Sequence, residues 1–254
     1  MFDDQVQQFR NVISALSELG TFVDTDKCVA LLCGDDTPDR IYFHLSFDDG
    51  FKNILSNAAP VLTALNVPAA IFVPTAIVSA GFDVVSQYCL VTTRYAAPVE
   101  MLSWADIAQL QAAGFTIGSH TRRHARFADL TNELRLREEI LYSKQDLEDK
   151  LGLECKYISW PYGTRADVTE QSIAYVRDCG YEACFGAFRG NLTPGKTNRY
   201  FIPRQHFEAG WPVSHVKFFI GRNFWLEFIP DACTGFPDEQ RAGCGDGLAF
   251  AKKL

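Results

Sequence analysis

Hydrophobic residues recur along the chain with two periods, and segments of the two kinds alternate. Apolar positions spaced three and four residues apart predict helices over 6–19, 54–65, 103–113, 131–151 and 169–178. Alternating or continuous apolar runs predict strands over 41–47, 69–73, 115–118, 157–160, 183–188 and 200–207. Strands that alternate with helices are typical of a parallel sheet, and this number of units favours an α/β barrel.

Length and composition are consistent with one large domain. The chain has 254 residues, of which 47% are hydrophobic, enough for a packed core. No sequence repeat and no linker rich in Pro, Gly or Ser divides it, so we expect a single domain over 1–254. The composition changes only near the end, where residues 230–254 read as an irregular tail.

The charge balance excludes several kinds of partner. A formal net charge of −7 opposes attraction to nucleic acid or anionic lipid. Residues 53–82 carry no charge, but Pro60, Pro68 and Pro74 interrupt them, so we predict no transmembrane segment. The first ten residues contain acids and no apolar signal region follows them, which leads us to expect a cytoplasmic protein.

The cysteine spacing does not predict a zinc ribbon. Eight are scattered along the chain without a Cys-x-x-Cys pair, so we expect them to be reduced and mostly structural. A disulfide between Cys233 and Cys244, in the tail, stays open.

The first candidate for chemistry is a pair of acids. Asp48 and Asp49 follow the predicted strand 41–47, and Gly50 supplies a turn directly after them. Carboxylates at the end of a buried strand lie at the rim of a core, where catalytic groups of an α/β barrel gather. The alternative is a plain turn in which an Asp caps the next helix.

The second candidate is a pair of histidines. His120 and His124 follow the strand 115–118, and a spacing of four residues on one helical turn would put both imidazoles on one side. Two His ligands and one carboxylate with open positions are what a catalytic Zn²⁺ ion requires. The alternative is two unrelated surface histidines.

The third candidate is the stretch SWPYG, residues 159–163, which follows another short strand. Alone it would be a Pro-containing turn. In the order SFDDG, SHTRRH and WPYG, however, the three stretches resemble the polysaccharide deacetylases of carbohydrate esterase family 4. The run GFTIGSHTRRH also resembles the approach to the family's His motif. The resemblance extends over 41–207.

The resemblance implies a fold and a reaction. The fold would be a distorted (β/α) barrel with about seven parallel strands, and the reaction metal-dependent hydrolysis of an N-acetyl or N-formyl group on an amino sugar. Position by position, Asp48 matches the general base, while Asp49, His120 and His124 match the ligands of one divalent ion, for which zinc is the expected metal. The backbone N–H of Tyr162 matches the oxyanion donor.

The chain departs from the family pattern at the acid and at the residue that orients the base. Ser159 stands where many members have an Arg, and the Asp-x-x-Asp-Trp and Leu-x-His motifs are missing. Members from bacterial exopolysaccharide pathways look similar in that they also replace this Arg, and the similarity suggests a role in surface-glycan biosynthesis. On the predicted strand 200–207, Arg204 and His206 point to one side. Arg204 is therefore our candidate to orient Asp48, and His206 our candidate general acid.

Several readings remain open at this stage. The alternative for the pair on 200–207 is an edge-strand His beside a solvent-exposed Arg, with His215 as the next candidate acid. His44 is expected to be a structural strand residue. For the whole chain, the alternatives are an amide hydrolase acting on a small non-sugar substrate and a non-catalytic carbohydrate-binding barrel. The oligomeric state is open.

Overall fold

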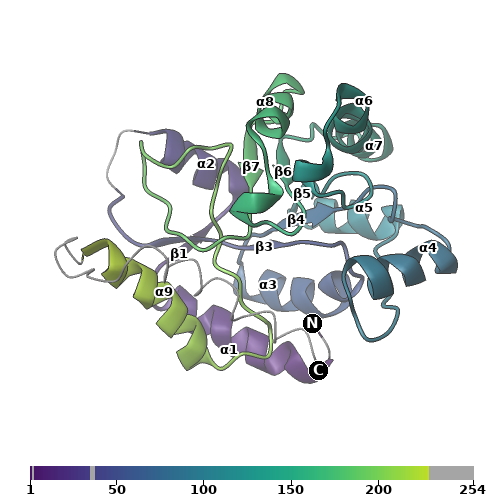
Figure 1. The fold of residues 1–254 in the computed structure, drawn as a ribbon. Coiled ribbons are helices and arrows are strands. Elements are labelled where there is room, and N and C mark those ends of the chain that lie inside the picture. Colours follow the sequence, from purple (N-terminus) through teal and green to yellow (C-terminus); the bar gives the residue numbers. More distant parts are fainter. Residues whose placement is uncertain (2, 35–37, 229–254) are drawn as a thin grey trace.

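The fold is built around a curled parallel sheet, shown in Figure 1. The computed structural model describes residues 1, 3–34 and 38–228, with side chains up to residue 221. Its strands are β1 (Thr21–Val23), β2 (Tyr42–His44), β3 (Ser46–Phe47), β4 (Ala70–Val73), β5 (Thr116–Ser119), β6 (Tyr157–Ser159) and β7 (Ala183–Phe185). β1 pairs with β2, and a five-stranded sheet follows in the order β3-β4-β5-β6-β7, with every pair parallel. Only Leu45 separates β2 from β3, so the two sheets form one curved surface.

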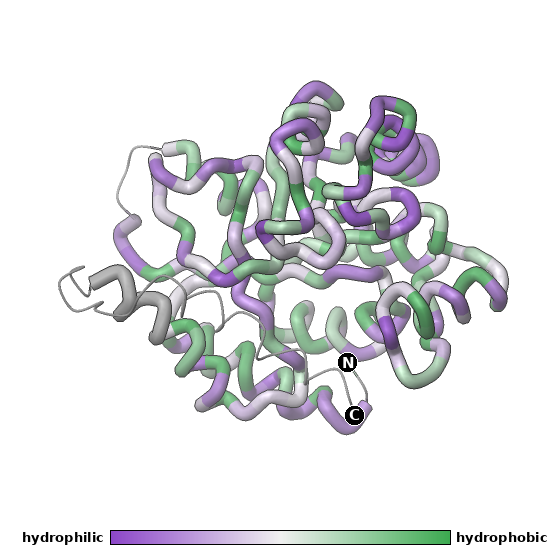
Figure 2. The backbone as a smooth tube through the Cα atoms, in the orientation of Figure 1, coloured by the Kyte–Doolittle hydropathy of each residue, from purple (hydrophilic) through white to green (hydrophobic). Residues whose placement is uncertain are grey.

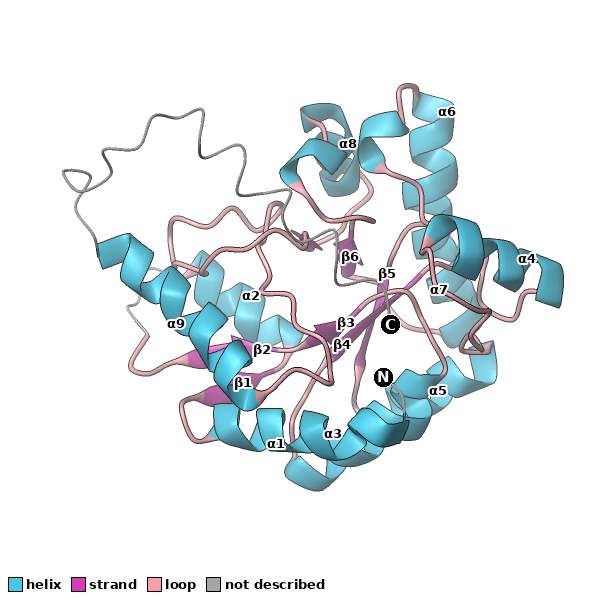
Figure 3. Ribbon diagram, turned by 60° about the horizontal axis from the view of Figure 1, so that its bottom comes forward, coloured by secondary structure: helices cyan, strands magenta, loops and turns pink. Residues whose placement is uncertain are grey.

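Helices connect the strands and lie around the sheet, as Figure 3 shows. They are α1 (Val6–Ser17), α2 (Thr25–Cys33), α3 (Ala59–Leu65), α4 (Phe82–Gln87), α5 (Trp104–Ala112), α6 (Glu133–Leu136), α7 (Tyr142–Leu151), α8 (Glu170–Asp178) and α9 (Val213–Phe228). Three π-helical turns adjoin them: η2 (Ile54–Ala58), η3 (Tyr88–Thr92) and η5 (Arg137–Leu141). Side-chain caps start several helices, as where Asp24 accepts the N–H of Lys27 at 2.7 Å.

The sheet is buried on both faces, which explains why its strands read as continuous apolar runs. In β4, Ala70 and Phe72 pack with Val29 of α2, while Ile71 and Val73 belong to the cluster formed with the other helices. Figure 2 shows hydrophobic residues along the strands and many polar residues on α6, α7 and α8. The catalytic candidates follow the C-terminal ends of β3, β5 and β6.

The structure confirms most predicted elements and corrects one. The helices predicted over 6–19, 54–65, 103–113, 131–151 and 169–178 are present, as is the distorted (β/α) barrel with parallel strands. The strand predicted over 200–207 is wrong as a regular strand: Ile202 forms one isolated bridge with Phe185. Pro203 has no N–H to continue a ladder. Backbone bonds nevertheless hold the segment beside β7, since Gly186 N–H donates to the Ile202 carbonyl at 2.8 Å.

Some elements were not predicted, and some predictions lie outside the described residues. β1, α2, α4 and α9 carried no signal that we used. Within the described ranges, no helix has the length and apolar character needed to cross a bilayer. Six cysteines there are free thiols: Cys28, Cys33, Cys89, Cys155, Cys179 and Cys184. The predicted tail over 230–254 and the Cys233–Cys244 pair lie outside what the structure describes.

Candidate active site

The acid pair lies on a sharp turn after β3, and its two carboxylates have different partners. Asp49 has a φ of 73°, and Gly50 follows in the same left-handed region. Arg204 donates to Asp48 through both ends of its guanidinium, at 2.9 Å to Oδ1 and 2.7 Å to Oδ2. The same guanidinium donates to the hydroxyls of Ser46 at 2.9 Å and Ser159 at 2.6 Å. Asp48 is therefore held by a fork-shaped, charge-assisted contact.

This contact sets the charge of Asp48. Burial raises the pKa of the Asp48 carboxyl, but the positive charge of Arg204, with that of His120 when protonated, outweighs burial and leaves the pKa below its ordinary value. The Asp48 side chain is 25% exposed and that of Arg204 13%. Asp48 is thus an ionised, accessible carboxylate at neutral pH.

The histidine pair lies in a loop, which corrects the predicted helical turn. Thr121 and His124 both have a φ of 63°, which no α-helix of L-residues accommodates. The imidazoles still come together, with ring centroids 4.9 Å apart. His120 Nδ1 is 2.8 Å from the Ser159 carbonyl, which can only accept, so this nitrogen carries the proton. In the neutral ring, Nε2 then keeps a free lone pair.

The Nε2 atoms of both histidines converge on Asp49. Its Oδ1 is 3.5 Å from His120 Nε2 and 3.2 Å from His124 Nε2, and one ligand atom from each residue lies within 4.8 Å of the others. Two ligands bound at about 2.1 Å to one tetrahedral ion are about 3.4 Å apart, so these separations fit a divalent metal. His124 Nδ1 is buried without a hydrogen-bond partner. The three residues suit a metal site of two nitrogens and one oxygen.

The electrostatics of the trio agree with this fit. Burial raises the pKa of Asp49, but hydrogen bonds from His120 and His124 hold it far below its ordinary value. Burial lowers the pKa of His124, and Asp49 only partly opposes this. For His120, burial also lowers the pKa, but Asp48 and Asp49 together raise it above the ordinary value. The ionised Asp49 and the deprotonated His124 are forms that bind metal, and a bound cation would have to displace the proton that the two acids favour on His120.

The third motif supplies a turn beside the histidines. Tyr162 has a φ of 64°, and its ring lies 5.1 Å from that of His124. The Arg126 guanidinium lies over the Tyr162 ring, 4.2 Å from its centroid, and pairs with the buried Asp167. This cation–π contact and ion pair hold the Tyr162 turn against the loop of His124.

One contact at the site was missed by sequence reasoning. Tyr88, in the π turn η3, is buried and donates its hydroxyl to Asp49 Oδ1 at 3.2 Å. Its ring also meets that of His124 at 5.6 Å. No motif surrounds Tyr88 in the sequence, so no signal there could have found it.

The remaining histidines are placed elsewhere. The His206 side chain is 59% exposed, and its Nε2 lies 3.0 Å from Glu208 Oε1. None of the contacts described for His206 joins it to the Asp48–Asp49 turn. His215 lies exposed in the first turn of α9. His44, as expected, is a structural residue of β2: it bonds Thr25 and stacks on Phe185.

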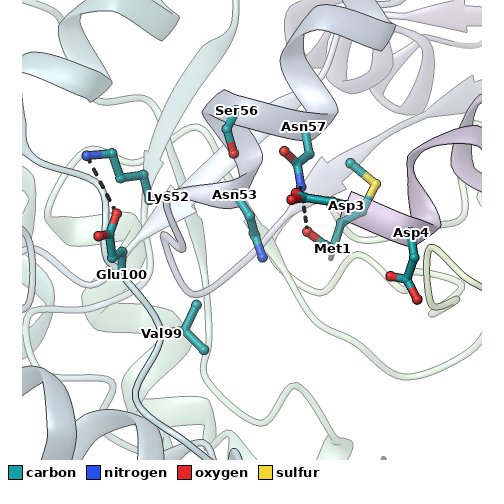
Figure 4. A pocket seen from close by; sticks show the side chains of 9 residues that line it. All are labelled: Met1, Asp3, Asp4, Lys52, Asn53, Ser56, Asn57, Val99 and Glu100. Carbon is teal, nitrogen blue, oxygen red and sulfur yellow. Dashed lines mark hydrogen bonds and ion pairs between the residues drawn. The ribbon is translucent and has the colours of Figure 1, made fainter.

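A cavity of about 610 Å³, shown in Figure 4, has walls from three parts of the chain: the first residues, residues 52–57 and residues 99–100. Its wall includes Lys52 and Asn53, which follow the turn of the acid pair in sequence. The backbone N–H of Lys52 donates to the Glu100 carbonyl at 2.8 Å, so these two residues of the wall are neighbours. The residues that line it are Met1, Asp3, Asp4, Lys52, Asn53, Ser56, Asn57, Val99 and Glu100.

Comparison with known proteins identifies the family. Residues 35–184 match the family described as polysaccharide deacetylase, and this is more than half of the chain. The chain therefore belongs to the polysaccharide deacetylase family. None of the curated proteins compared with it matches.

Solved structures share the fold. The chain is similar to IcaB from Ammonifex degensii, with 22% identity, a TM-score of 0.68, and coverage of 87% of this chain and 88% of that one. The Streptococcus pyogenes deacetylase PplD in complex with acetate has 16% identity and a TM-score of 0.68, with coverage of 83% of this chain and 84% of that one. A de-N-acetylase from Aggregatibacter actinomycetemcomitans has 19% identity and a TM-score of 0.61, with coverage of 83% of this chain and 86% of that one.

Proposed function

We propose that the protein is a metal-dependent hydrolase that removes an N-acyl group, N-acetyl in the first place and N-formyl as an alternative, from an amino sugar of a surface polysaccharide or glycan. The observation that carries the proposal is the separation of roles within the acid pair. Asp49 faces two imidazoles, while Asp48, its neighbour, faces a guanidinium. One carboxylate cannot both bind an ion and move a proton, so two with different partners are needed.

Asp49, His120 and His124 would hold the ion. When bound, a divalent cation supplies Lewis acidity that polarises the acyl carbonyl and makes a water molecule easier to deprotonate. Zinc is the expected ion because its sites combine imidazole nitrogen with carboxylate oxygen and leave a position open. Ser159 supports this role, since its carbonyl fixes the tautomer and direction of His120.

Asp48 would take the proton from the attacking water. Its low pKa means that it is ionised at neutral pH, and Arg204 prevents its carboxylate from turning towards the metal ligands. Arg204 thus takes the place of the Arg that the family has where this chain has Ser159. The Ser159 hydroxyl accepts a bond from Arg204, so the two positions form one unit.

The backbone N–H of Tyr162 would donate to the oxyanion that forms on the acyl group. The leaving amine needs a proton, and His206 remains our candidate donor, with His215 next. His206 pairs with Glu208, so in this role its ring would have to exchange that contact for the substrate. Variants of both histidines decide between them.

The substrate class rests on the family. The structural neighbours are called deacetylases or a de-N-acetylase. A cytoplasmic location is likewise a proposal, which fractionation of the full-length protein tests.

The test combines substrate, metal and base. The purified protein is stripped with a chelator, reloaded with Zn²⁺, and assayed for released acetate or formate on N-acyl amino-sugar polymers, sugar nucleotides and small amides. We expect turnover only with metal, and loss of metal in His124→Ala. Asp48→Asn should keep the metal and lose about 10²- to 10⁴-fold in rate. Asp178→Asn, an exposed change on α8, is the matched control.

Each alternative has its own outcome in this assay. Turnover of small amides alone would replace the sugar substrate with a non-sugar one. Binding of polymer without any turnover would make the protein a carbohydrate-binding barrel. A metal content in His124→Ala equal to that of the unaltered protein would remove the proposed ligand set.

A further inference from the structure

The loop between the two histidines is held from outside by a buried acid that none of the sequence motifs contains. Glu139 is 6% exposed and lies in the π turn η5, between α6 and α7. Its Oε2 accepts the backbone N–H of Arg122 at 3.2 Å and that of Arg123 at 2.8 Å. One carboxylate oxygen therefore binds two successive N–H groups in the middle of the His120–His124 segment.

This arrangement is an anion-binding concavity of the backbone, occupied by a side chain of the same protein. Successive N–H groups in a turn point to one side and attract negative charge. Hydrogen bonds to an ionised acceptor are roughly twice as strong as those between neutral groups. The Arg123 guanidinium adds a contact of 3.4 Å to the other oxygen, but its side chain is 55% exposed and contributes little.

The loop needs such support because its backbone is strained. Left-handed conformations at Thr121 and His124 cost about 1–2 kcal/mol each for residues with a Cβ atom. Without external contacts the segment would relax to a different turn, and the two imidazoles would no longer face Asp49. Glu139 is in contact with the part of the loop that lies between the two strained positions.

Other contacts support the loop at its edges. Thr75 N–H donates to the Thr121 carbonyl at 3.2 Å, and Ala76 N–H donates to that of Arg122 at 2.8 Å. Asp146 of α7 accepts from Thr75 at 2.7 Å and from the Arg122 side chain at 3.3 Å. Glu139 differs from these because it binds both central N–H groups and carries a full charge. Its position in a π turn, a feature often found at functional sites, is consistent with a special placement.

We propose that Glu139 is a positioning residue that fixes His120 and His124 for metal binding before the ion arrives. The inference rests on the metal site of the proposed function and deepens it. Glu139 touches neither substrate nor metal ligand side chains; it acts through the backbone of the segment that joins the two histidines.

The experiment measures metal affinity and loop order separately. Glu139→Gln keeps a neutral acceptor of the same shape, Glu139→Ala removes the acceptor, and Glu138→Gln makes the same change of charge one residue away. Zn²⁺ affinity is measured by competition with a chromophoric chelator. Exchange of the Arg122 and Arg123 amides is measured in the metal-free protein by NMR, and the free energy of unfolding by urea.

We expect Glu139→Ala to bind Zn²⁺ about 10- to 100-fold more weakly, the usual cost of losing a residue that supports a metal ligand. Glu139→Gln should lose less, because its oxygen still accepts, and Glu138→Gln should match the unaltered protein. Both Glu139 variants should exchange the two amides faster without metal. If Glu139→Ala fails to fold, the Gln variant alone decides.

The outcomes distinguish this inference from the function on which it rests. Zn²⁺ affinity within twofold of the unaltered protein in a folded Glu139 variant would overturn the inference, even if the variant is less stable. Loss of stability alone would mean an ordinary structural role. If the unaltered protein binds no Zn²⁺, the proposed metal site fails, and unchanged amide exchange in the variants would reject the loop-holding role as well.

Discussion

Removal of Arg204 is the perturbation for which the structure predicts the largest effect on the candidate base. Arg204 makes two short bonds to Asp48 and further bonds to two serines, and it is 13% exposed. Removing one partner of a buried pair costs about 3–5 kcal/mol. Because the Asp48 side chain is 25% exposed, we expect Arg204→Met to lower the free energy of unfolding by about 3 kcal/mol, the low end of this range.

A double-mutant cycle isolates the pair. Asp48→Asn leaves Arg204 its serine partners, so we expect a smaller loss of about 2 kcal/mol. In the double variant no charge is left without its partner, and the total loss should be about 3 kcal/mol instead of about 5, a coupling of about 2 kcal/mol. Arg199→Met, at an exposed site nearby, should change stability by less than about 0.5 kcal/mol.

The assay is urea unfolding of the metal-free proteins at pH 7.5, because bound metal would add its own stabilisation. A second measurement is the pH–rate profile of metal-loaded Arg204→Met. With Arg204 gone, burial still raises the pKa of Asp48 while the main influence that lowers it is lost, so the acidic limb of the profile should move to higher pH. Additive losses within about 0.5 kcal/mol, together with an unmoved acidic limb, would refute the reasoning.

Three further predictions concern other parts of the molecule. Burial lowers the pKa of His44 to about 3, so only the unfolded chain binds a proton at this residue as the pH falls below about 6.5. The free energy of unfolding should therefore drop by about 2 kcal/mol between pH 7.5 and pH 5. Urea unfolding of His44→Phe over the same pH range should lack this drop. Gly163 has a φ of 73°, and a Cβ atom there would lie 2.3 Å from the Cβ of Ala187. Gly163→Ala should therefore lower the free energy of unfolding by more than about 2 kcal/mol. The control Gly152→Ala, where the space is open, should lower it by about 1 kcal/mol. If His206 donates the proton, His206→Gln should lower the rate on substrates with poor leaving groups more than on those with good ones. An equal loss of rate on both kinds of substrate would assign that role elsewhere.

The sequence was most informative where a chemical group follows a strand. The adjacency of Asp48 to Asp49 and the order of three motifs were enough to predict the trio that the structure brings together. Arg204 was predicted beside Asp48 from a strand that is not regular. Arg204 reaches Asp48 because backbone bonds keep this segment along β7 although Pro203 interrupts the ladder.

The parts that were not predicted depend on tertiary context. A spacing of four residues suggested a helical turn for His120 and His124, but two left-handed residues bring the same imidazoles together in a loop. From π turns, Tyr88 contacts Asp49 and Glu139 contacts the loop between the two histidines. Periodicity alone does not predict which side chain a π turn directs inward. Helix α2 fills the inner face of the sheet, a position that hydrophobic patterning does not distinguish from the outer one.

The contact between Asp48 and Arg204 joins residues 156 positions apart, and this separation has a consequence for synthesis on the ribosome. At about 5–20 residues per second, Arg204 is made roughly 8–30 s after Asp48. Throughout that interval the nascent chain carries its acid pair and, later, both histidines without the guanidinium that separates base from ligand. Either acid could then bind an ion. Docking of the 200–207 segment beside β7 is the event that would give the two carboxylates different tasks, so a chain released before this point would carry the metal-site residues without a positioned base.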